Sequence, residues 1–268
     1  MGHRTVVPNS RGEIPTATRR SLALLCLAAG GVLLATPARP FSQEAPTKRV
    51  WSKDFRPSGS GRPLPLPAIV DGRPVGLWWY PYVSNFGATR GAAGFDTEVF
   101  LPDGTFAGLF RPGGPRSVDL DGMRAAGEQD SIGSYSVSGG VMTIVWGGKS
   151  SRPMSAPVRV QPFLGSQIFE WADRQYQPAL PVRRDELIGH WSNGSAGGIT
   201  WRADGSVTAA RYFFDDGPSR ASDTVDGSWE LDGYLLAFHF PALGERFLTV
   251  FRPLKGGLAF KGFMWTKK

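Results

Sequence analysis

The chain has 268 residues, of which 41% are hydrophobic, so it is long enough for one or two domains with packed cores. The 35 glycines and 22 prolines make up about a fifth of the residues and, with 12% aromatic residues, they favour short strands and turns over long helices. The net charge of +7 is not gathered in a run of Lys and Arg, which argues against nucleic-acid binding.

The first 38 residues have the pattern of an export signal. Arg19 and Arg20 precede an apolar run over residues 22–35, and small residues follow at 36–38. The run is too short to span a bilayer comfortably. The paired arginines resemble a twin-arginine signal, while general secretion and an uncleaved anchor stay open as alternatives. We expect an extracytoplasmic protein, periplasmic or secreted, with no stable membrane span once the signal is cleaved.

A proline-rich stretch follows the export signal. Residues 39–70 contain repeated prolines and the sequence Ser-Gly-Ser-Gly at residues 58–61, without an apolar period. Such composition is typical of a disordered linker or spacer.

The pattern then changes to short apolar runs separated by turn residues, which predicts a first β unit over residues 71–175. Its expected elements are strands at residues 76–80 and 95–101, a turn at Asp103–Gly104, a strand at 106–110, a short helix at 118–126, a hairpin at 133–146, and strands at 158–161 and 167–171.

Polar residues 172–186 include two prolines and are interpreted as a junction to a second β unit, residues 183–268. The expected elements of this unit are a strand at residues 199–202, a turn at Asp204–Gly205, a strand at 207–214, a hairpin at 227–240, and strands at 246–251 and 258–265.

The two units carry the same landmarks in the same order. The hairpins at residues 133–146 and 227–240 align without a gap, so that Tyr135 matches Trp229. Two further landmarks recur, a Gly-x-Trp motif at Gly76–Trp78 and Gly189–Trp191, and the Asp-Gly turns at Asp103 and Asp204. Repeated meanders of this kind predict an all-β protein made of two related antiparallel units.

These landmarks resemble those of bacterial lipocalin-like domains, which share a leading Gly-x-Trp, an Asp-Gly hairpin and a Gly-x-aromatic strand. The resemblance is carried by Gly189–Trp191, Asp204–Gly205 and Gly227–Trp229, and more loosely by the first unit. It implies an up-and-down barrel with Trp191, and by analogy Trp78, closing one end. Two half-open barrels, one joint barrel or a sandwich all remain open.

The sequence contains no pattern that identifies a reaction. The only cysteine, Cys26, lies in the export signal, and His190 and His239 are interpreted as strand residues rather than metal ligands. Asp96 and Glu98 share one face of a strand, yet an exposed strand face explains such a pair as well as catalysis does. No catalytic residue, metal site or cofactor is predicted.

Aromatic residues offer the one hint of a binding surface. Trp78 and Trp79 are consecutive, so on a strand they point to opposite faces, and only one of them is expected in the core. The residues expected to line a binding site in the longer opening segment of the first unit are Trp79, Tyr80, Tyr82, Phe86 and Arg90.

The sequence thus favours an exported, non-enzymatic β protein that binds a small apolar or amphipathic ligand. A structural or protein-interaction component of the cell envelope is the first alternative. An envelope hydrolase, which would need a carboxylate pair in a cleft, is the second.

Overall fold

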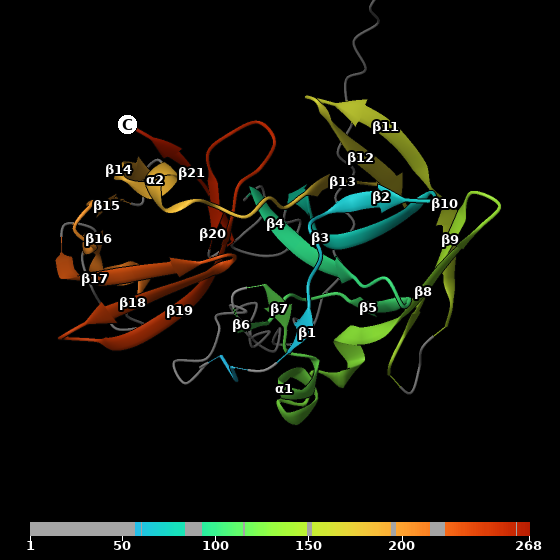
Figure 1. The fold of residues 1–268 in the computed structure, drawn as a ribbon, viewed down its shortest axis with the longest axis horizontal. Coiled ribbons are helices and arrows are strands. Elements are labelled where there is room, and N and C mark those ends of the chain that lie inside the picture. The colour runs from blue at the N-terminus through green and yellow to red at the C-terminus, as the bar shows by residue number, and fades with distance from the viewer. Residues whose placement is uncertain are drawn as a thin grey trace, which may run out of the picture. The chain divides into compact units, whose positions relative to one another are not determined.

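The computed structural model describes residues 57–59, 61–83, 93–114, 116–148, 152–193, 197–214, 223–260 and 262–268, all within the compact unit Thr47–Lys268. The predicted export signal, with Cys26, lies outside the described residues. Antiparallel strands dominate, and they form two barrel-like sheets (Figure 1). The predicted fold class, two related antiparallel β units, is confirmed.

The C-terminal sheet, called barrel two, is a closed barrel of consecutive antiparallel strands. Its strands are β14 (Gly189–Ser192), β15 (Gly198–Trp201), β16 (Ser206–Ala210), β17 (Thr224–Asp232), β18 (Leu235–Phe240), β19 (Gly244–Phe251), β20 (Leu258–Phe260) and β21 (Phe263–Lys267). The first strand pairs with the last, Trp191 opposite Lys267, and this pairing closes the barrel.

The N-terminal sheet, called barrel one, repeats this order with additions. Its strands are β3 (Arg73–Val83), β4 (Ala93–Phe100), β5 (Thr105–Ala107), β8 (Ile132–Ser138), β9 (Val141–Trp146), β10 (Met154–Pro157), β11 (Arg159–Phe163), β12 (Ser166–Trp171) and β13 (Arg174–Pro178). The path of paired strands begins at β10 and ends at β11, which are separated along the chain by Val158 alone. In barrel two the single strand β19 pairs with both β18 and β20, so β10 and β11 together correspond to β19.

The two barrels also share their pairing register. In the first predicted hairpin Tyr135 lies opposite Ile144, and in the second its counterpart Trp229 lies opposite Phe238. The first and last strands agree too, since Trp78 lies opposite Pro178 as Trp191 lies opposite Lys267. Residues of the two barrels can therefore be compared position by position.

The predicted Asp-Gly turns are confirmed and are built alike. The Asp103 carboxylate accepts a hydrogen bond from the Thr105 amide at 3.0 Å, and Asp204 accepts one from the Ser206 amide at 2.8 Å. Short polar side chains favour turns because they satisfy local backbone donors in this way. The glycine that follows each aspartate has φ of 85° or 86°, a left-handed conformation that favours glycine.

Alternation of side chains along the strands divides the apolar residues among three cores. One fills barrel one and includes Trp78, and another fills barrel two and includes Trp191. The third is formed by residues of both barrels, among them Trp79 of β3, Tyr234, and Phe251 of β19. The Tyr234 hydroxyl also donates a 2.8 Å hydrogen bond to the carbonyl of Ala179, in the segment that connects the barrels.

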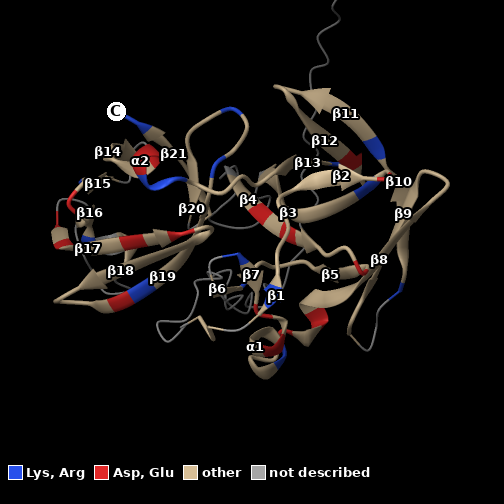
Figure 2. Cartoon of the chain, in the orientation of Figure 1, with Lys and Arg blue, Asp and Glu red and all other residues tan. Residues whose placement is uncertain are grey.

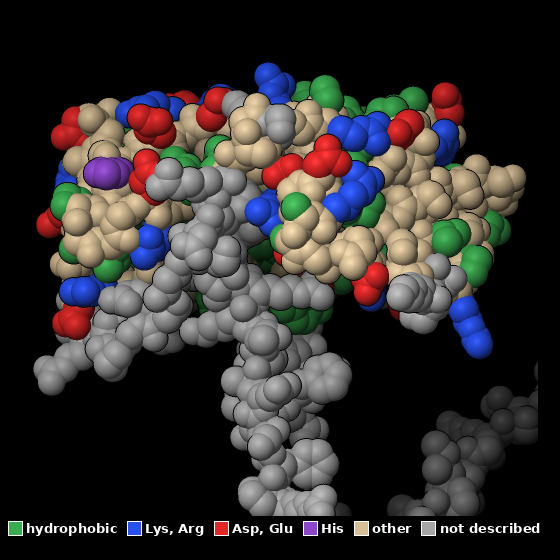
Figure 3. All heavy atoms as spheres, turned by 90° about the horizontal axis from the view of Figure 1, so that it is seen from below, with side chains coloured by type: hydrophobic (Ala, Val, Ile, Leu, Met, Phe, Trp, Pro, Cys, Tyr) green, Lys and Arg blue, Asp and Glu red, His purple; other side chains and the backbone are tan. Residues whose placement is uncertain are grey.

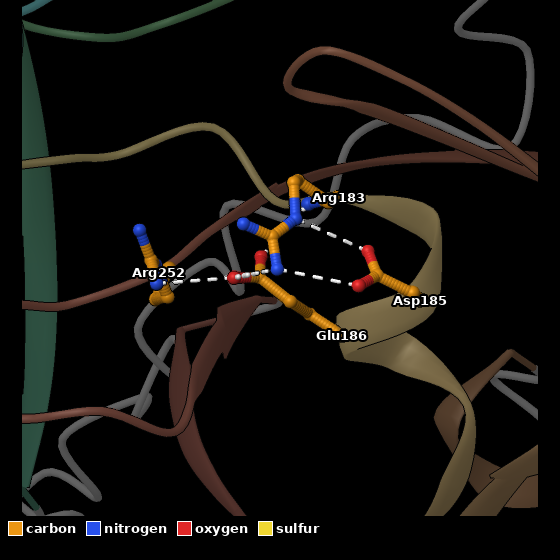
Figure 4. A network of polar contacts seen from close by, with 4 residues as sticks. All are labelled: Arg183, Asp185, Glu186 and Arg252. Carbon is orange, nitrogen blue, oxygen red and sulfur yellow. Dashed lines mark hydrogen bonds and ion pairs between the residues drawn. The ribbon is translucent and has the colours of Figure 1, made fainter.

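The connecting segment ends in the short helix α2 (Arg184–Leu187). Glu186 accepts a hydrogen bond from the Arg183 amide at 2.9 Å and forms an ion pair with Arg252, just after β19, at 3.0 Å. Figure 4 shows Glu186 between the two arginines, with Asp185 on the other side of the Arg183 guanidinium. Glu186 thus ties α2 to barrel two.

Several boundaries differ from the sequence-based expectation. Residues 61–70, expected in the linker, contain β1 (Arg62–Pro63) and β2 (Ala68–Val70), and β2 pairs with β3. Residues 174–178, expected in the junction, form β13, which pairs with β3. β1 and β13 pair with strands distant in sequence, which local patterns do not reveal, whereas β2 forms a tight hairpin with the adjacent β3.

The additions to barrel one lie mainly between β5 and β8. They are β6 (Pro112–Gly114), β7 (Ser117–Val118), the helix α1 (Leu120–Ala125) and a 3-10 turn, η2 (Gln129–Ser131). The strand expected at 106–110 ends at Ala107. That expected at 207–214 ends at Ala210, followed by a 3-10 turn, η3 (Arg211–Phe213). The predicted helix is present within residues 118–126.

Candidate functional site: a polar cluster in barrel one

The consecutive tryptophans are both buried, on opposite faces of β3. Trp78 belongs to the interior of barrel one, and its indole donates to the Val75 carbonyl at 2.8 Å. Trp79 faces outward but is only 5% exposed, because it packs against Phe251 of barrel two with ring centroids 5.8 Å apart. The outward tryptophan is therefore explained by packing between the barrels rather than by an exposed binding surface.

The five residues predicted to line a site are not all brought together. Trp79 lies in the shared core, while Tyr80 faces the interior of barrel one and is 8% exposed. Tyr82 is two residues further on the same face of β3 and is 43% exposed. Phe86 and Arg90 lie outside the described residues. Of the five, Tyr80 and Tyr82 therefore share one face of β3, and a binding role for them stays a prediction.

Tyr80 belongs to a group of charged and phenolic side chains on three adjacent strands, called the polar cluster. Its hydroxyl donates to Asp96 at 3.2 Å, and the Arg174 guanidinium lies over its ring at 4.7 Å from the centroid. Arg174 also forms an ion pair with Glu98 at 3.4 Å. The Tyr176 ring contacts that of Tyr80 at 5.0 Å.

Strand pairing places these five residues on one face. Asp96 of β4 lies opposite Tyr80 of β3, and Glu98 lies opposite Trp78. Strand β13 lies on the other side of β3, where Pro178 pairs with Trp78. Because side chains alternate along a strand, Tyr176 and Arg174 point to the same side as Pro178, into the barrel.

Glu98 is the most perturbed acid of the cluster. Its residue is 2% exposed, and this burial, which disfavours the charged form, raises the pKa of its carboxyl to about 7. Asp96 adds to the increase, whereas Tyr176 and Arg174 oppose it. Burial, and then the neighbouring Glu98 charge, also raise the pKa of both Tyr80 and Tyr176 above the usual range.

Part of the polar cluster is unsatisfied. Among the described residues, neither Oε2 of Glu98 nor the hydroxyl of Tyr176 forms a hydrogen bond of good geometry, although Tyr176 lies close enough to Glu98 to lower the pKa of its carboxyl through a side-chain interaction. A buried polar group without a partner typically costs about 1–3 kcal/mol, and more when it is charged. The interior of barrel one therefore contains a buried acceptor and a buried hydroxyl whose hydrogen-bonding capacity is not fully used.

Barrel two has apolar residues at the positions of Glu98, Tyr176 and Arg174, whereas Asn193 and Gly197 correspond to Tyr80 and Asp96. Ile199 lies opposite Trp191, just as Glu98 lies opposite Trp78. Lys267 corresponds to Pro178, because each lies opposite the tryptophan of its barrel. Counting back along the strand, Trp265 then corresponds to Tyr176 and Phe263 to Arg174. The barrel architecture thus does not require the polar cluster, because its second copy closes without one.

Chemically, the cluster can hold a polar or charged group and exchange a proton with it near neutral pH. The Arg174 side chain is 42% exposed, so the cluster extends from the buried Glu98 to the surface. Within the described part of the chain, no three His, Cys, Asp or Glu residues are placed to hold a metal ion.

Sequence reasoning noted Asp96 and Glu98 as a same-face pair but missed Arg174 and Tyr176, because their strand falls in the expected junction. One signal was available for Glu98. Counting from the repeated Asp-Gly turns aligns it with Ile199, and a charged residue at an apolar position of the repeat marks an unusual environment.

Other aromatic residues of barrel two belong to its core. Phe213 and Phe214 are buried in barrel two. Trp191 is also buried there, with its indole donating to the Leu187 carbonyl at 2.8 Å. His190 is exposed and its Nδ1 is 2.8 Å from the Thr200 hydroxyl.

Charged residues of both signs are distributed over both barrels (Figure 2). On the face drawn in Figure 3, acidic and basic side chains are scattered among each other. Of the helices that the structure describes, none has the length and apolar character needed to cross a membrane.

Comparisons with known protein-family models, with curated proteins and with solved structures return no match.

Proposed function

We propose that this chain is an exported, non-enzymatic protein of lipocalin-like design, in which barrel one binds a small amphipathic ligand at the polar cluster. Tyr82 and the exposed part of Arg174 form the outer edge of the site, and Glu98 with Tyr176 form its inner end. The apolar part of the ligand would contact the tyrosine rings.

The observation that carries this proposal is Glu98. A buried carboxyl with an unpartnered oxygen destabilises a fold, and the equivalent position in barrel two is filled by Ile199. Groups that cost stability are concentrated at functional sites, where a ligand supplies the missing contacts. A ligand that hydrogen-bonds Glu98 and Tyr176 would remove the cost.

Barrel two has a supporting role in this proposal. Aromatic rings are in direct contact inside both barrels, such as Phe260 and Trp265 with centroids 4.4 Å apart in barrel two and Phe169 and Tyr176 with centroids 4.5 Å apart in barrel one, so the difference between the barrels lies in the polar cluster. The outer surface of barrel two covers Trp79 of barrel one through Phe251. Barrel two therefore holds β3, the strand that carries Tyr80 and Tyr82.

Ligand binding can be tested by intrinsic tryptophan fluorescence, with calorimetry, against a panel of amphipathic compounds. The informative variant is Glu98→Ile, which installs the residue of the second barrel. Its control is Glu230→Ile, at an exposed position of barrel two. We expect saturable binding by the wild type and the control, weakened tenfold or more in Glu98→Ile. Absence of binding by any compound, or equal binding by all three proteins, would refute the proposal.

A structural or interaction role in the cell envelope is the second candidate. Exposed apolar side chains on strands β10 and β11 of barrel one and in the hairpin after β11 favour it, namely Met154, Val160 and Leu164. Crosslinking in intact cells that recovers one dominant envelope protein, lost in a Val160→Ser, Leu164→Ser double variant, would support this role over ligand binding.

A further inference from the structure

We infer that the polar cluster recognises a cation, the primary ammonium group of an amphipathic molecule. This inference rests on the proposed function of barrel one and adds the chemical class of its ligand. It is carried by the charge, the unpartnered atoms and the ring geometry of the cluster.

The first argument is charge. The cluster holds two carboxylates, Asp96 and Glu98, against a single guanidinium, that of Arg174. Arg174 pairs with Oε1 of Glu98 at 3.4 Å, while Oε2 forms no hydrogen bond of good geometry among the described residues. When Glu98 is ionised the cluster lacks one positive charge, which a cationic ligand supplies and an anionic ligand does not.

The second argument is hydrogen bonding. An ammonium group has three donors and no acceptor. The unpartnered Oε2 of Glu98 is an acceptor, and the hydroxyl of Tyr176 can accept as well as donate. One ammonium group can therefore satisfy both buried atoms at once, whereas a carboxylate or phosphate would bring further acceptors to a carboxylate oxygen.

The third argument is the ring geometry. Tyr80 already has a cation over its ring, the Arg174 guanidinium at 4.7 Å, and the Tyr176 ring lies 5.0 Å from that of Tyr80. Cations are attracted to the faces of aromatic rings, more strongly where water is excluded. Arg174 thus occupies part of the environment that a ligand ammonium group would enter, and the two cations compete for Glu98.

Proton linkage gives a test that depends on the sign of the ligand's charge. A cation binds best to ionised Glu98, whose carboxyl has a pKa of about 7, while Asp96 and Arg174 are the other charged groups that act on it. Affinity for a cation should then be about tenfold higher at pH 8 than at pH 6, following the ionised fraction of Glu98. An anion would show the opposite trend.

The experiment compares n-decylammonium, n-decanoate and a non-ionic decyl glucoside, below their micelle concentrations, by calorimetric titration at pH 6 and pH 8. An alkylammonium stays protonated over this range, as lysine does. We expect n-decylammonium to bind most tightly, with about tenfold tighter binding at pH 8 and proton release near pH 6. The pH effect should vanish in Glu98→Gln and persist in the surface control Glu230→Gln.

A second variant tests the competition. Arg174→Gln removes the competing cation and also the charge that lowers the pKa of Glu98, so the variant is compared with the wild type at pH 9, where Glu98 is ionised. There it should bind n-decylammonium severalfold more tightly than the wild type and should not bind n-decanoate. Weaker ammonium binding in this variant, or the same affinity at pH 6 and pH 8 in the wild type, would overturn the inference. If n-decanoate or the glucoside binds instead, and Glu98→Ile abolishes that binding, the cation is excluded while the proposed function stands.

Discussion

Glu98 and Ile199 occupy the same position in the two barrels, each opposite the tryptophan of a Gly-x-Trp motif across the first strand pair. The duplicated barrel therefore contains an internal reference for the polar cluster. Barrel two shows which residue occupies this position where no polar cluster is present, and it supplies the substitution Glu98→Ile, which removes the carboxyl group.

The first prediction concerns stability against pH. The pKa of Glu98 is raised from 4.5 to about 7 in the folded state, so the folded state holds this proton more tightly than the unfolded state does. The resulting contribution to the free energy of unfolding is fully present below about pH 4.5 and is lost as pH rises through about 7. Relative to Glu98→Gln, the wild type should lose about 2–3 kcal/mol of unfolding free energy between pH 5 and pH 8. Urea unfolding at both pH values measures this difference.

The matched control for that measurement is Glu230→Gln, on the exposed side of β17. It should follow the wild type over the same pH range. A Glu98→Gln profile parallel to the wild type would show that burial does not perturb Glu98 in the way described.

The second prediction concerns the paired turns. Gly104 and Gly205 have nearly the same positive φ, so alanine at either should cost about 1–2 kcal/mol from backbone strain alone. A Cβ at Gly104 would also meet the Tyr135 carbonyl at 3.1 Å, whereas at Gly205 the nearest atom is the movable end of Arg184. Thermal and urea unfolding should therefore rank Gly104→Ala as the more destabilised, and the reverse order would contradict the turn geometry.

The third prediction concerns the core shared by the barrels. Trp79→Ala and Phe251→Ala should each cost about 3–5 kcal/mol, because both rings are fully packed. Since the rings are in contact, a double-mutant cycle should give a coupling of about 0.5–1.5 kcal/mol. The ring of Phe238 contacts Phe214 and Phe240 instead. The losses of stability in Phe238→Ala and Trp79→Ala should therefore be additive. Strict additivity of Trp79 and Phe251 would argue against their contact.

The fourth prediction separates two neighbouring acids of α2. Glu186→Ala should cost about 1–2 kcal/mol, because Glu186 caps the helix through the Arg183 amide and pairs with Arg252. Asp185→Ala should leave stability almost unchanged, because Asp185 pairs only with Arg183 in a solvent-exposed position. Equal effects in urea unfolding would show that Glu186 does not anchor the helix.

Much of the fold could be predicted because it depends on local signals. The Asp-Gly turns need only a carboxylate, a glycine and the next amide, as Asp103 and Thr105 show. The hairpins at residues 133–146 and 227–240 follow from alternating apolar residues around a glycine turn, and their repetition predicted two related units.

The candidate site was predicted only in part. Of the residues expected to line a site, Tyr80 faces the interior of barrel one and Tyr82 follows on the same face of β3, whereas Trp79 points into the core between the barrels. Alternation of side chains along β3 determines that its two faces differ, but it does not determine which residues pack on each face. Phe251, which packs on Trp79, comes from the second barrel, far along the chain.

By itself, the sequence determined an all-β chain with two related meanders, because turns and strand periodicity are local properties of the polypeptide. The tertiary structure alone decided that β13 returns to pair with β3, which brings Arg174 within 3.4 Å of Glu98 across 76 positions of the chain. Non-local pairing also decided that Glu98 is buried. The physical reason is that burial and charge pairing depend on which distant strands meet, and period-two patterns do not specify strand partners.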